Sequence, residues 1–386
     1  MSAQRQKIPP ASLPSHQKLT RAWLLSAAVD IAGVVLVALI LSSHWVMEAV
    51  MRWGILAGLA VFYELRIFKN LLPLFVSDKN ERSADIDFAT KLMVLSGLCY
   101  ALLAGFLLVT PPKGGLGWIP AILALGGILT DILSMVSCRR RCERAQGNQQ
   151  LASEFRALGT LALTAVAVHY GKIDAWFLLI GAMEYLILFT HGWLSKKGRS
   201  LLGEGSSSLR LPWRYLYHAI LTLTMLPVAG NSALHLAGLA FALLYFLTAL
   251  RDWFILAGLI DPNQSQYQQI KAGFQSALTG WLALSIRLLA AMAVATVVAD
   301  MVFHFEMYAE AFRSDLGAGV IILLLVTVSP FLLMGIRARL FALIGFAALG
   351  GILLMMGQNE VINIGLILLG LTAGLGQGTI AVEKAD

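Results

Sequence analysis

The chain has 386 residues, of which 58% are apolar and 13% are charged, and its formal net charge is +7 at pH 7. Soluble globular domains carry about 25% charged residues, so this composition excludes a soluble enzyme or a soluble binding domain. The basic residues gather in the segments between apolar stretches. Their placement favours contact with anionic lipid headgroups over binding to nucleic acid.

Apolar stretches of roughly 17–25 residues recur along the whole chain, and this is the length that a helix needs to cross a bilayer. We therefore predict an all-α polytopic membrane protein with about twelve transmembrane helices. In chain order, the predicted spans are residues 22–41, 46–63, 89–109, 117–136, 157–170, 174–194, 215–229, 234–250, 278–303, 316–334, 341–356 and 361–379.

The segments between these spans differ in charge from one side of the membrane to the other. If the N-terminus lies inside, the inner segments hold most of the Lys and Arg residues. The outer segments then carry little more than Arg52, Lys113, Lys172 and Arg313. Positive residues concentrate on the cytoplasmic side of membrane proteins. The sequence therefore predicts a multi-pass protein of the cell membrane with both termini in the cytoplasm.

Two polar segments divide the series of spans. They are SDKNERSADID, after the second span, and IDPNQSQYQQIK, after the eighth. We predict three modules on this basis. Residues 1–83 form a cytoplasmic tail with two helices, residues 84–262 form a six-helix core, and residues 263–386 form a four-helix module.

Asp131 lies near the inner end of the fourth span, and Arg139, Arg140 and Arg141 follow it closely. An ionisable group at membrane depth is costly, so it marks a candidate functional site. From residue type alone, Asp131 could bind a cation, pair with an arginine or accept a proton. Its apolar neighbours do not decide among these roles.

Three segments of the central region look like parts of a known family. They are CYALLAGFLL, TDILSMVSCRRRCERAQGNQQLASEFRALG and TALRDWFILAGLIDP. Together with the order of the six central spans, they resemble the membrane core of CDP-alcohol phosphatidyltransferases, and the resemblance covers residues 84–262. The family carries the motif D-x2-D-G-x2-A-R-x8-G-x3-D-x3-D. Its four aspartates hold divalent metal against the CDP diphosphate, and the last one acts as general base.

Aligned without a gap, the resemblance places Asp131 at the first motif aspartate and Arg139 at the motif arginine. The other three aspartates correspond to Ser134, Ala152 and Arg156. Mg2+ binds oxygen ligands, usually including carboxylates, and Asp131 with Arg156 sums to about zero charge. Repulsion in place of attraction costs a dication several kcal/mol at an effective dielectric near 20. We therefore expect that Asp131 alone does not hold the metal and that no cofactor is bound.

The expected function is thus a lipid-binding, scaffolding or regulatory role in phospholipid metabolism, without catalysis. Arg139, Arg140, Arg156 and Arg210 are the candidate ligands of a phosphate headgroup. One alternative is an active phosphotransferase that moves a phospho-alcohol group from a CDP-linked donor with Mg2+ or Mn2+. The other alternative is a membrane transporter.

Further charged residues and glycines leave two questions open. Asp30, Glu184 and Asp300 lie within or at the ends of spans. They predict either an ion pathway or pairing between helices, and we favour pairing. Gly370, Gly374 and Gly378 recur every four residues, which is typical of close helix contacts in lipid. These contacts would be made within the chain or in a homo- or hetero-oligomer.

Overall fold

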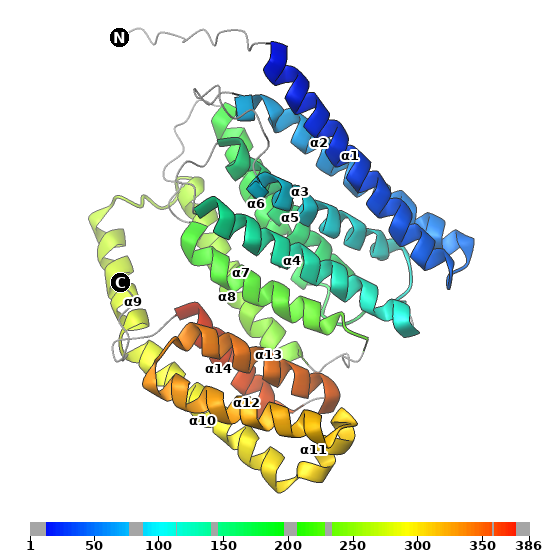
Figure 1. The fold of residues 1–386 in the computed structure, drawn as a ribbon. Coiled ribbons are helices and arrows are strands. Elements are labelled where there is room, and N and C mark those ends of the chain that lie inside the picture. Colours follow the sequence, from blue (N-terminus) through cyan, green and yellow to red (C-terminus); the bar gives the residue numbers. More distant parts are fainter. Residues whose placement is uncertain are drawn as a thin grey trace. The chain divides into compact units, whose positions relative to one another are not determined.

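The structure is a computed structural model that describes residues 13–76, 88–112, 114–139, 146–196, 207–227, 234–356 and 359–375. Every regular element within these ranges is a helix (Figure 1). The chain forms two compact units, residues 1–166 and 167–386. The boundary between them lies inside the interval 84–262, and the division into three modules stays a prediction.

The first unit is built from long helices that follow one another in the sequence. Its elements are α1 (Leu13–Ser42), α2 (Met47–Val76), α3 (Phe88–Ala104), the 3-10 turns η1 (Gly105–Leu108) and η2 (Gly114–Gly117), α4 (Trp118–Arg139) and most of α5 (Gln146–His169). Helix α3 packs against both α2 and α4, and α1 packs against α2. Because these helices are largely apolar, each of them has an apolar face that packs against a neighbouring helix.

Small residues bring three helices of this unit close together around Tyr100. A Cβ atom at Gly127 of α4 would lie 2.6 Å from the Tyr100 ring, and one at Gly159 of α5 would lie 2.5 Å from it. The ring is fully buried, with 1% of the residue exposed. Glycine at both positions therefore lets the α4 and α5 backbones approach the ring of α3, as small residues do in membrane helices.

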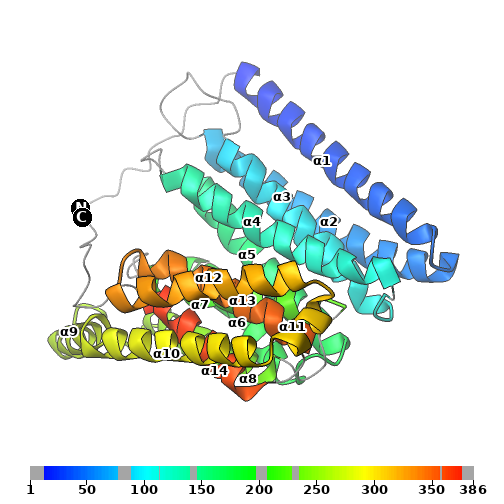
Figure 2. The same cartoon turned by 60° about the horizontal axis from the view of Figure 1, so that its bottom comes forward.

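The second unit contains the remaining helices. They are α6 (Phe177–Lys196), α7 (Ser207–Thr224), α8 (His235–Leu256), α9 (Ser265–Thr279), α10 (Trp281–Phe303), α11 (Phe305–Phe312), α12 (Asp315–Met334), α13 (Ala338–Met356) and α14 (Glu360–Leu375). Helix α8 packs against α6 and α7. Helix α10 packs against α12 and α14 (Figure 2). Helix α14 also contacts α7 and α8, so it joins the two groups of helices in this unit.

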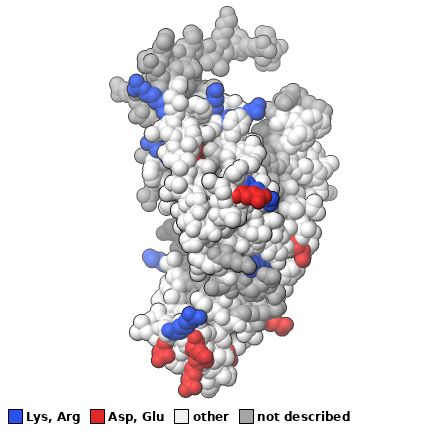
Figure 3. Space-filling model, turned by 90° about the vertical axis from the view of Figure 1, so that its right-hand side faces the viewer, with Lys and Arg blue, Asp and Glu red and all other residues white. Residues whose placement is uncertain are grey.

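Nine helical segments among the described residues are long and apolar enough to cross a membrane. Large apolar side chains also point outward, such as Leu24, Leu25 and Leu39 of α1, which are 54%, 66% and 64% exposed. The face drawn in Figure 3 is mostly uncharged, with few Lys, Arg, Asp or Glu side chains. A soluble protein rarely exposes apolar surface on this scale, so the chain is a multi-pass membrane protein.

The glycines of α14 pack against aromatic rings of the same unit. A Cβ atom at Gly370 would lie 2.2 Å from Cζ of Phe241 on α8, and one at Gly374 would lie 2.6 Å from Cη2 of Trp213 on α7. Both described glycines therefore serve close packing within the chain. Gly378 lies outside the described residues, and an oligomer through this helix stays a prediction.

Gly370→Ala is expected to lower the free energy of unfolding by about 1–3 kcal/mol, because the new methyl group overpacks the contact with Phe241. Gly351→Ala on α13 is the matched control, since a Cβ atom there meets nothing within 4 Å. The control should gain about 0.5–1 kcal/mol from alanine's preference for helix. Apparent melting temperatures in one detergent compare the two. Equal shifts in both variants would contradict the packing contact.

Candidate functional site

The first candidate site lies between α4 and α5 and is closed by an ion pair. Arg156 Nε of α5 lies 3.4 Å from Asp131 Oδ1 of α4. The Asp131 side chain is 6% exposed and that of Arg156 is 20% exposed. The two residues that align with the first and last motif aspartates therefore meet in space. They carry opposite charges, so the pair presents no net negative charge to a dication.

The other two motif positions serve local structure. The Ser134 hydroxyl donates a hydrogen bond to the carbonyl oxygen of Asp131 at 2.7 Å, one turn back on the same helix. Ala152 lies in an apolar cluster with Phe68, Met93 and Phe155. A carboxylate at position 152 would therefore enter an apolar environment, where a charge without a partner is costly.

Most of the basic segment after α4 lies outside the described residues. Arg139 is the last residue of α4, and its side chain lies outside the described part. Arg140 lies outside it altogether. Arg156 and Arg210 are thus the two predicted phosphate ligands whose side chains the structure describes, and Arg210 belongs to a second site.

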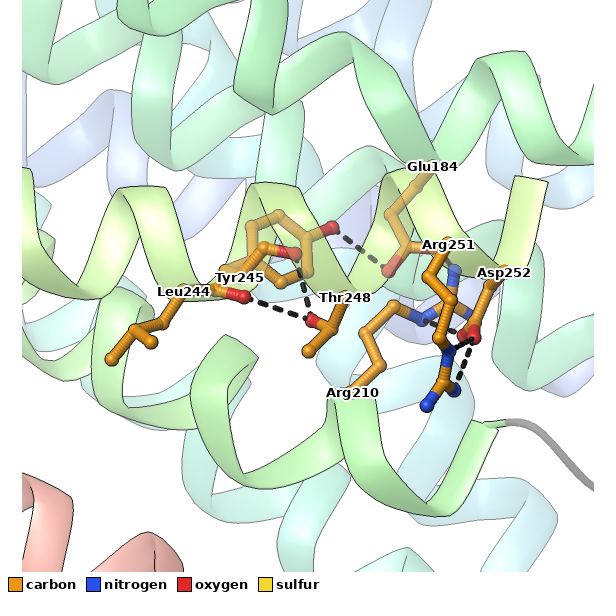
Figure 4. Close-up of polar contacts among 7 residues, drawn as sticks. All are labelled: Glu184, Arg210, Leu244, Tyr245, Thr248, Arg251 and Asp252. Carbon is orange, nitrogen blue, oxygen red and sulfur yellow. Dashed lines mark hydrogen bonds and ion pairs between the residues drawn. The ribbon is translucent and has the colours of Figure 1, made fainter. Parts of the chain in front are cut away.

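This second site is a cluster of charged side chains from α6, α7 and α8, here called the α6–α8 ion cluster (Figure 4). Its members are Glu184, Arg210, Arg214, Tyr245, Arg251 and Asp252. Arg210 Nη1 lies 3.3 Å from Glu184 Oε2, and Arg210 Nε lies 3.7 Å from Asp252 Oδ2. One guanidinium of α7 therefore joins carboxylates of the two neighbouring helices.

Hydrogen bonds hold both carboxylates of the cluster. The Tyr245 hydroxyl donates to Glu184 Oε1 at 2.9 Å, and Arg251 Nε donates to Asp252 Oδ1 at 3.1 Å. The Tyr245 ring also stacks on Tyr217 of α7, with ring centroids 5.7 Å apart and an interplanar angle of 15°. Buried charges need such partners, and here the partners of Glu184 and Asp252 come from α7 and α8.

Arginines of α7 and α8 lie around the acidic groups of the cluster. Arg210 and Arg251 pair with the carboxylates of Glu184 and Asp252, and Arg214 interacts electrostatically with Tyr245. Arg210 Nη1 is buried and makes no hydrogen bond of good geometry. A guanidinium offers five N–H donors in a planar fork, so Arg210 retains donors for a further acceptor. An oxyanion such as a phosphate suits this chemistry.

The remaining predicted residues fall in different settings. Asp300 lies at the end of α10, where it accepts a hydrogen bond from the Tyr308 hydroxyl at 2.5 Å and lies 3.0 Å from His304 Nδ1. Asp30 is fully buried on α1. Glu184 pairs with an arginine of a neighbouring helix, as predicted for the buried acids, whereas no described residue forms such an ion pair with Asp30.

Sequence reasoning missed Glu64, Tyr245, Asp252 and the pairing role of Arg251. Glu64 and Asp252 lie one and two residues beyond the predicted spans 46–63 and 234–250. The helices continue past those limits, since α2 ends at Val76 and α8 ends at Leu256. One sequence signal could have identified Glu64 and Asp252. Each is a carboxylate that follows an apolar span by one or two residues, where the helix still continues.

The described residues contain no group of three or more His, Cys, Asp or Glu side chains that could hold a metal ion. The anionic and cationic groups of the two sites instead pair with each other. The chain matches no protein-family model, no curated protein and no solved structure.

Proposed function

We propose that the protein is a membrane-embedded binding protein for anionic phospholipid headgroups, with a scaffolding or regulatory role in phospholipid metabolism. Its architecture would be that of a CDP-alcohol phosphatidyltransferase, with a six-helix core at residues 84–262. Helices α2, α7 and α14 would add to the nine apolar segments to make up about twelve spans in the cell membrane. Both termini would lie in the cytoplasm.

The observation that carries this proposal is Arg210 in the α6–α8 ion cluster. Its side chain is 16% exposed, and its Nη1 atom lies 3.3 Å from Glu184 Oε2 but makes no hydrogen bond of good geometry. Arg251 of α8 adds a second guanidinium beside the Asp252 carboxylate. Arg210 lies in the first turn of α7 and Arg251 in the last two turns of α8. In the proposed topology both positions lie toward the cytoplasmic leaflet, at the depth of phosphate headgroups.

The ion pair between Asp131 and Arg156 is the reason why we propose that the protein does not catalyse the family reaction. Metal-dependent transfer of a phosphate group needs divalent ions that neutralise the developing charge and orient the reactants. Arg156 Nε lies 3.4 Å from Asp131 Oδ1. The proposed resemblance would put a ligand carboxylate at the position of Arg156. The positive charge of Arg156 repels a divalent cation, and this supports the proposal that the site binds no metal and is catalytically inactive.

Lipid binding is tested with dioctanoyl phosphatidic acid added to the purified protein in detergent. The double variant Glu184→Gln/Arg210→Gln keeps the net charge of the cluster and removes the guanidinium fork. We expect its affinity to fall about tenfold or more, since a charge-assisted bidentate contact contributes at least ~1.4 kcal/mol. Native mass spectrometry or thermophoresis measures the change.

Arg339→Gln is the control for this experiment. Arg339 is an exposed arginine in the first turn of α13 and shares the predicted cytoplasmic side, so its loss should leave the affinity unchanged. Equal binding by the double variant would overturn the headgroup site. Inorganic phosphate that displaces the lipid completely would show recognition of phosphate alone and would argue against a lipid function.

Two assays separate the alternative functions from this proposal. Turnover of CDP-diacylglycerol by the purified protein in Mg2+ or Mn2+ would establish an active phosphotransferase. Substrate uptake into proteoliposomes that is lost in Asp30→Asn or Glu184→Gln would establish a transporter. We expect neither activity from the α6–α8 ion cluster, because its carboxylates are already paired with arginines.

A further inference from the structure

Two carboxyl groups in the first unit are buried without a hydrogen-bond partner. Asp30 of α1 and Glu64 of α2 are each 0% exposed. None of their four side-chain oxygens is hydrogen-bonded in the described part of the chain. This differs from the α6–α8 ion cluster, in which each carboxylate faces arginine. Buried polar groups almost always have a hydrogen-bond partner. The lack of one here suggests that Asp30 and Glu64 bind a ligand.

Three helices bring these carboxyl groups together. The Trp23 indole of α1 donates a hydrogen bond to the carbonyl oxygen of Leu65 on α2 at 3.2 Å, next to Glu64. Asp30 follows Trp23 by two helical turns and so lies on the same face of α1. The carboxyl groups of Asp30 and Glu64 are close enough to interact electrostatically.

Helix α3 supplies the space for the Glu64 carboxyl. A Cβ atom at Gly97 would lie 2.6 Å from Glu64 Oε1, so any larger residue at this position would collide with the carboxyl group. Cys99 on the same helix is the titratable group of α3 that interacts electrostatically with Glu64. Residues of α1, α2 and α3 thus together form the environment of the Glu64 carboxyl group.

No cation balances the pair within the described residues. The electrostatic partners of Asp30 and Glu64 there include no Lys, Arg or His. Two ionised carboxylates in such a place would be prohibitively costly, and a buried group of this kind neutralises itself instead. The pair therefore requires a bound positive species.

The backbone around the pair favours a proton over a metal ion. Sodium sites within membranes use carbonyl oxygens that are freed where helices unwind. Here α1, α2 and α3 run unbroken through positions 30, 64 and 97, so their carbonyl groups are engaged in helical hydrogen bonds. Two carboxyl groups alone offer few ligands to a metal ion, whereas a proton needs only one oxygen of the carboxyl group that binds it.

We propose that Asp30 and Glu64 form a proton-binding site of the membrane-embedded first unit. Each carboxylate that takes up a proton from water at a membrane face becomes a neutral carboxylic acid, so the pair carries no charge once both groups are protonated. Intramembrane acids with this setting are typical of proton relays. The site is separate from the proposed headgroup site, since it lies in the other unit of the chain.

Infrared difference spectroscopy of the full-length protein in lipid tests the proposal. The carbonyl stretching band of protonated carboxyl groups is compared between acidic and alkaline buffer. We expect the wild type to show this band and each of the variants Asp30→Asn and Glu64→Gln to show a weaker one. The double variant should lose the whole contribution of Asp30 and Glu64 to the band. Glu48→Gln is the control, because Glu48 is 73% exposed and paired with Arg52 on α2.

The outcomes are distinguishable. A band that is unchanged in the double variant would overturn the proposal. A band that sodium suppresses at fixed pH, relative to choline, would also overturn it, because a metal ion would then occupy the pair. Glu64→Gln and Asp30→Asn resemble the protonated groups in shape, so both should keep the wild-type melting temperature. Strong destabilisation by either would point to an ionised carboxylate and contradict a bound proton.

Discussion

Arg210→Met is expected to lower the free energy of unfolding by about 3–5 kcal/mol, because it leaves buried carboxylates without their counter-charge. Glu184 and Asp252 have side chains that are 6% and 5% exposed. Asp252 keeps Arg251 as a partner, but Glu184 loses the guanidinium whose Nη1 lies 3.3 Å away. The apparent melting temperature in detergent measures the loss.

A second substitution should restore most of this stability. Glu184→Gln/Arg210→Met removes the charge of Glu184 together with its partner, and replacing a whole buried ion pair is often nearly neutral. Arg339→Met removes an exposed arginine and should change the free energy of unfolding by less than about 0.5 kcal/mol. If the double variant were as unstable as Arg210→Met, loss of the arginine stem's packing would explain the effect, and the ion pair would not.

Arg156→Asp is expected to create a response to Mn2+ that the wild type lacks. The variant places a second carboxylate beside Asp131, where the wild type has an ion pair. Without metal, the two like charges should destabilise the protein by about 3–5 kcal/mol. With Mn2+ at one hundred times its dissociation constant, binding should return about 2.7 kcal/mol. Melting curves with and without Mn2+ measure both effects.

Arg156→Asn is the matched control for this prediction. It also breaks the ion pair but adds no carboxylate, so it should be destabilised without any rescue by Mn2+. Equal rescue of both variants would show that the metal acts elsewhere. Stabilisation of the wild-type protein by Mn2+ would contradict the silent site, because Asp131 would then bind metal in the presence of Arg156.

The membrane character of this protein follows from local sequence alone. Hydropathy and helix length act within each segment, so they predict the all-helical architecture that the described residues confirm. The placement of Asp131 and Arg156 in one motif also suggested a shared site, and their side chains do meet. The family, the count of about twelve spans and the headgroup function stay predictions, since they depend on comparisons that found no match.

The limits of helices were harder to predict than their existence. Hydropathy ends a span where charged residues begin, but a helix ends where its hydrogen bonding and packing end. Helix α2 therefore runs to Val76 and carries Glu64 into the interior of the first unit. Helix α8 carries Asp252 into the α6–α8 ion cluster in the same way. Both carboxylates were missed for this reason.

The sequence by itself identified the charged residues that interrupt apolar stretches, such as Asp30 and Glu184, because each of them breaks a run of apolar residues. Only the tertiary structure decided which of them have partners. Glu184 pairs with Arg210 of a neighbouring helix. Asp30 interacts electrostatically with Glu64 and with no cation within the described residues. Partner choice depends on how helices turn their faces toward each other, and packing between distant segments sets those rotations. A single segment contains no information on them.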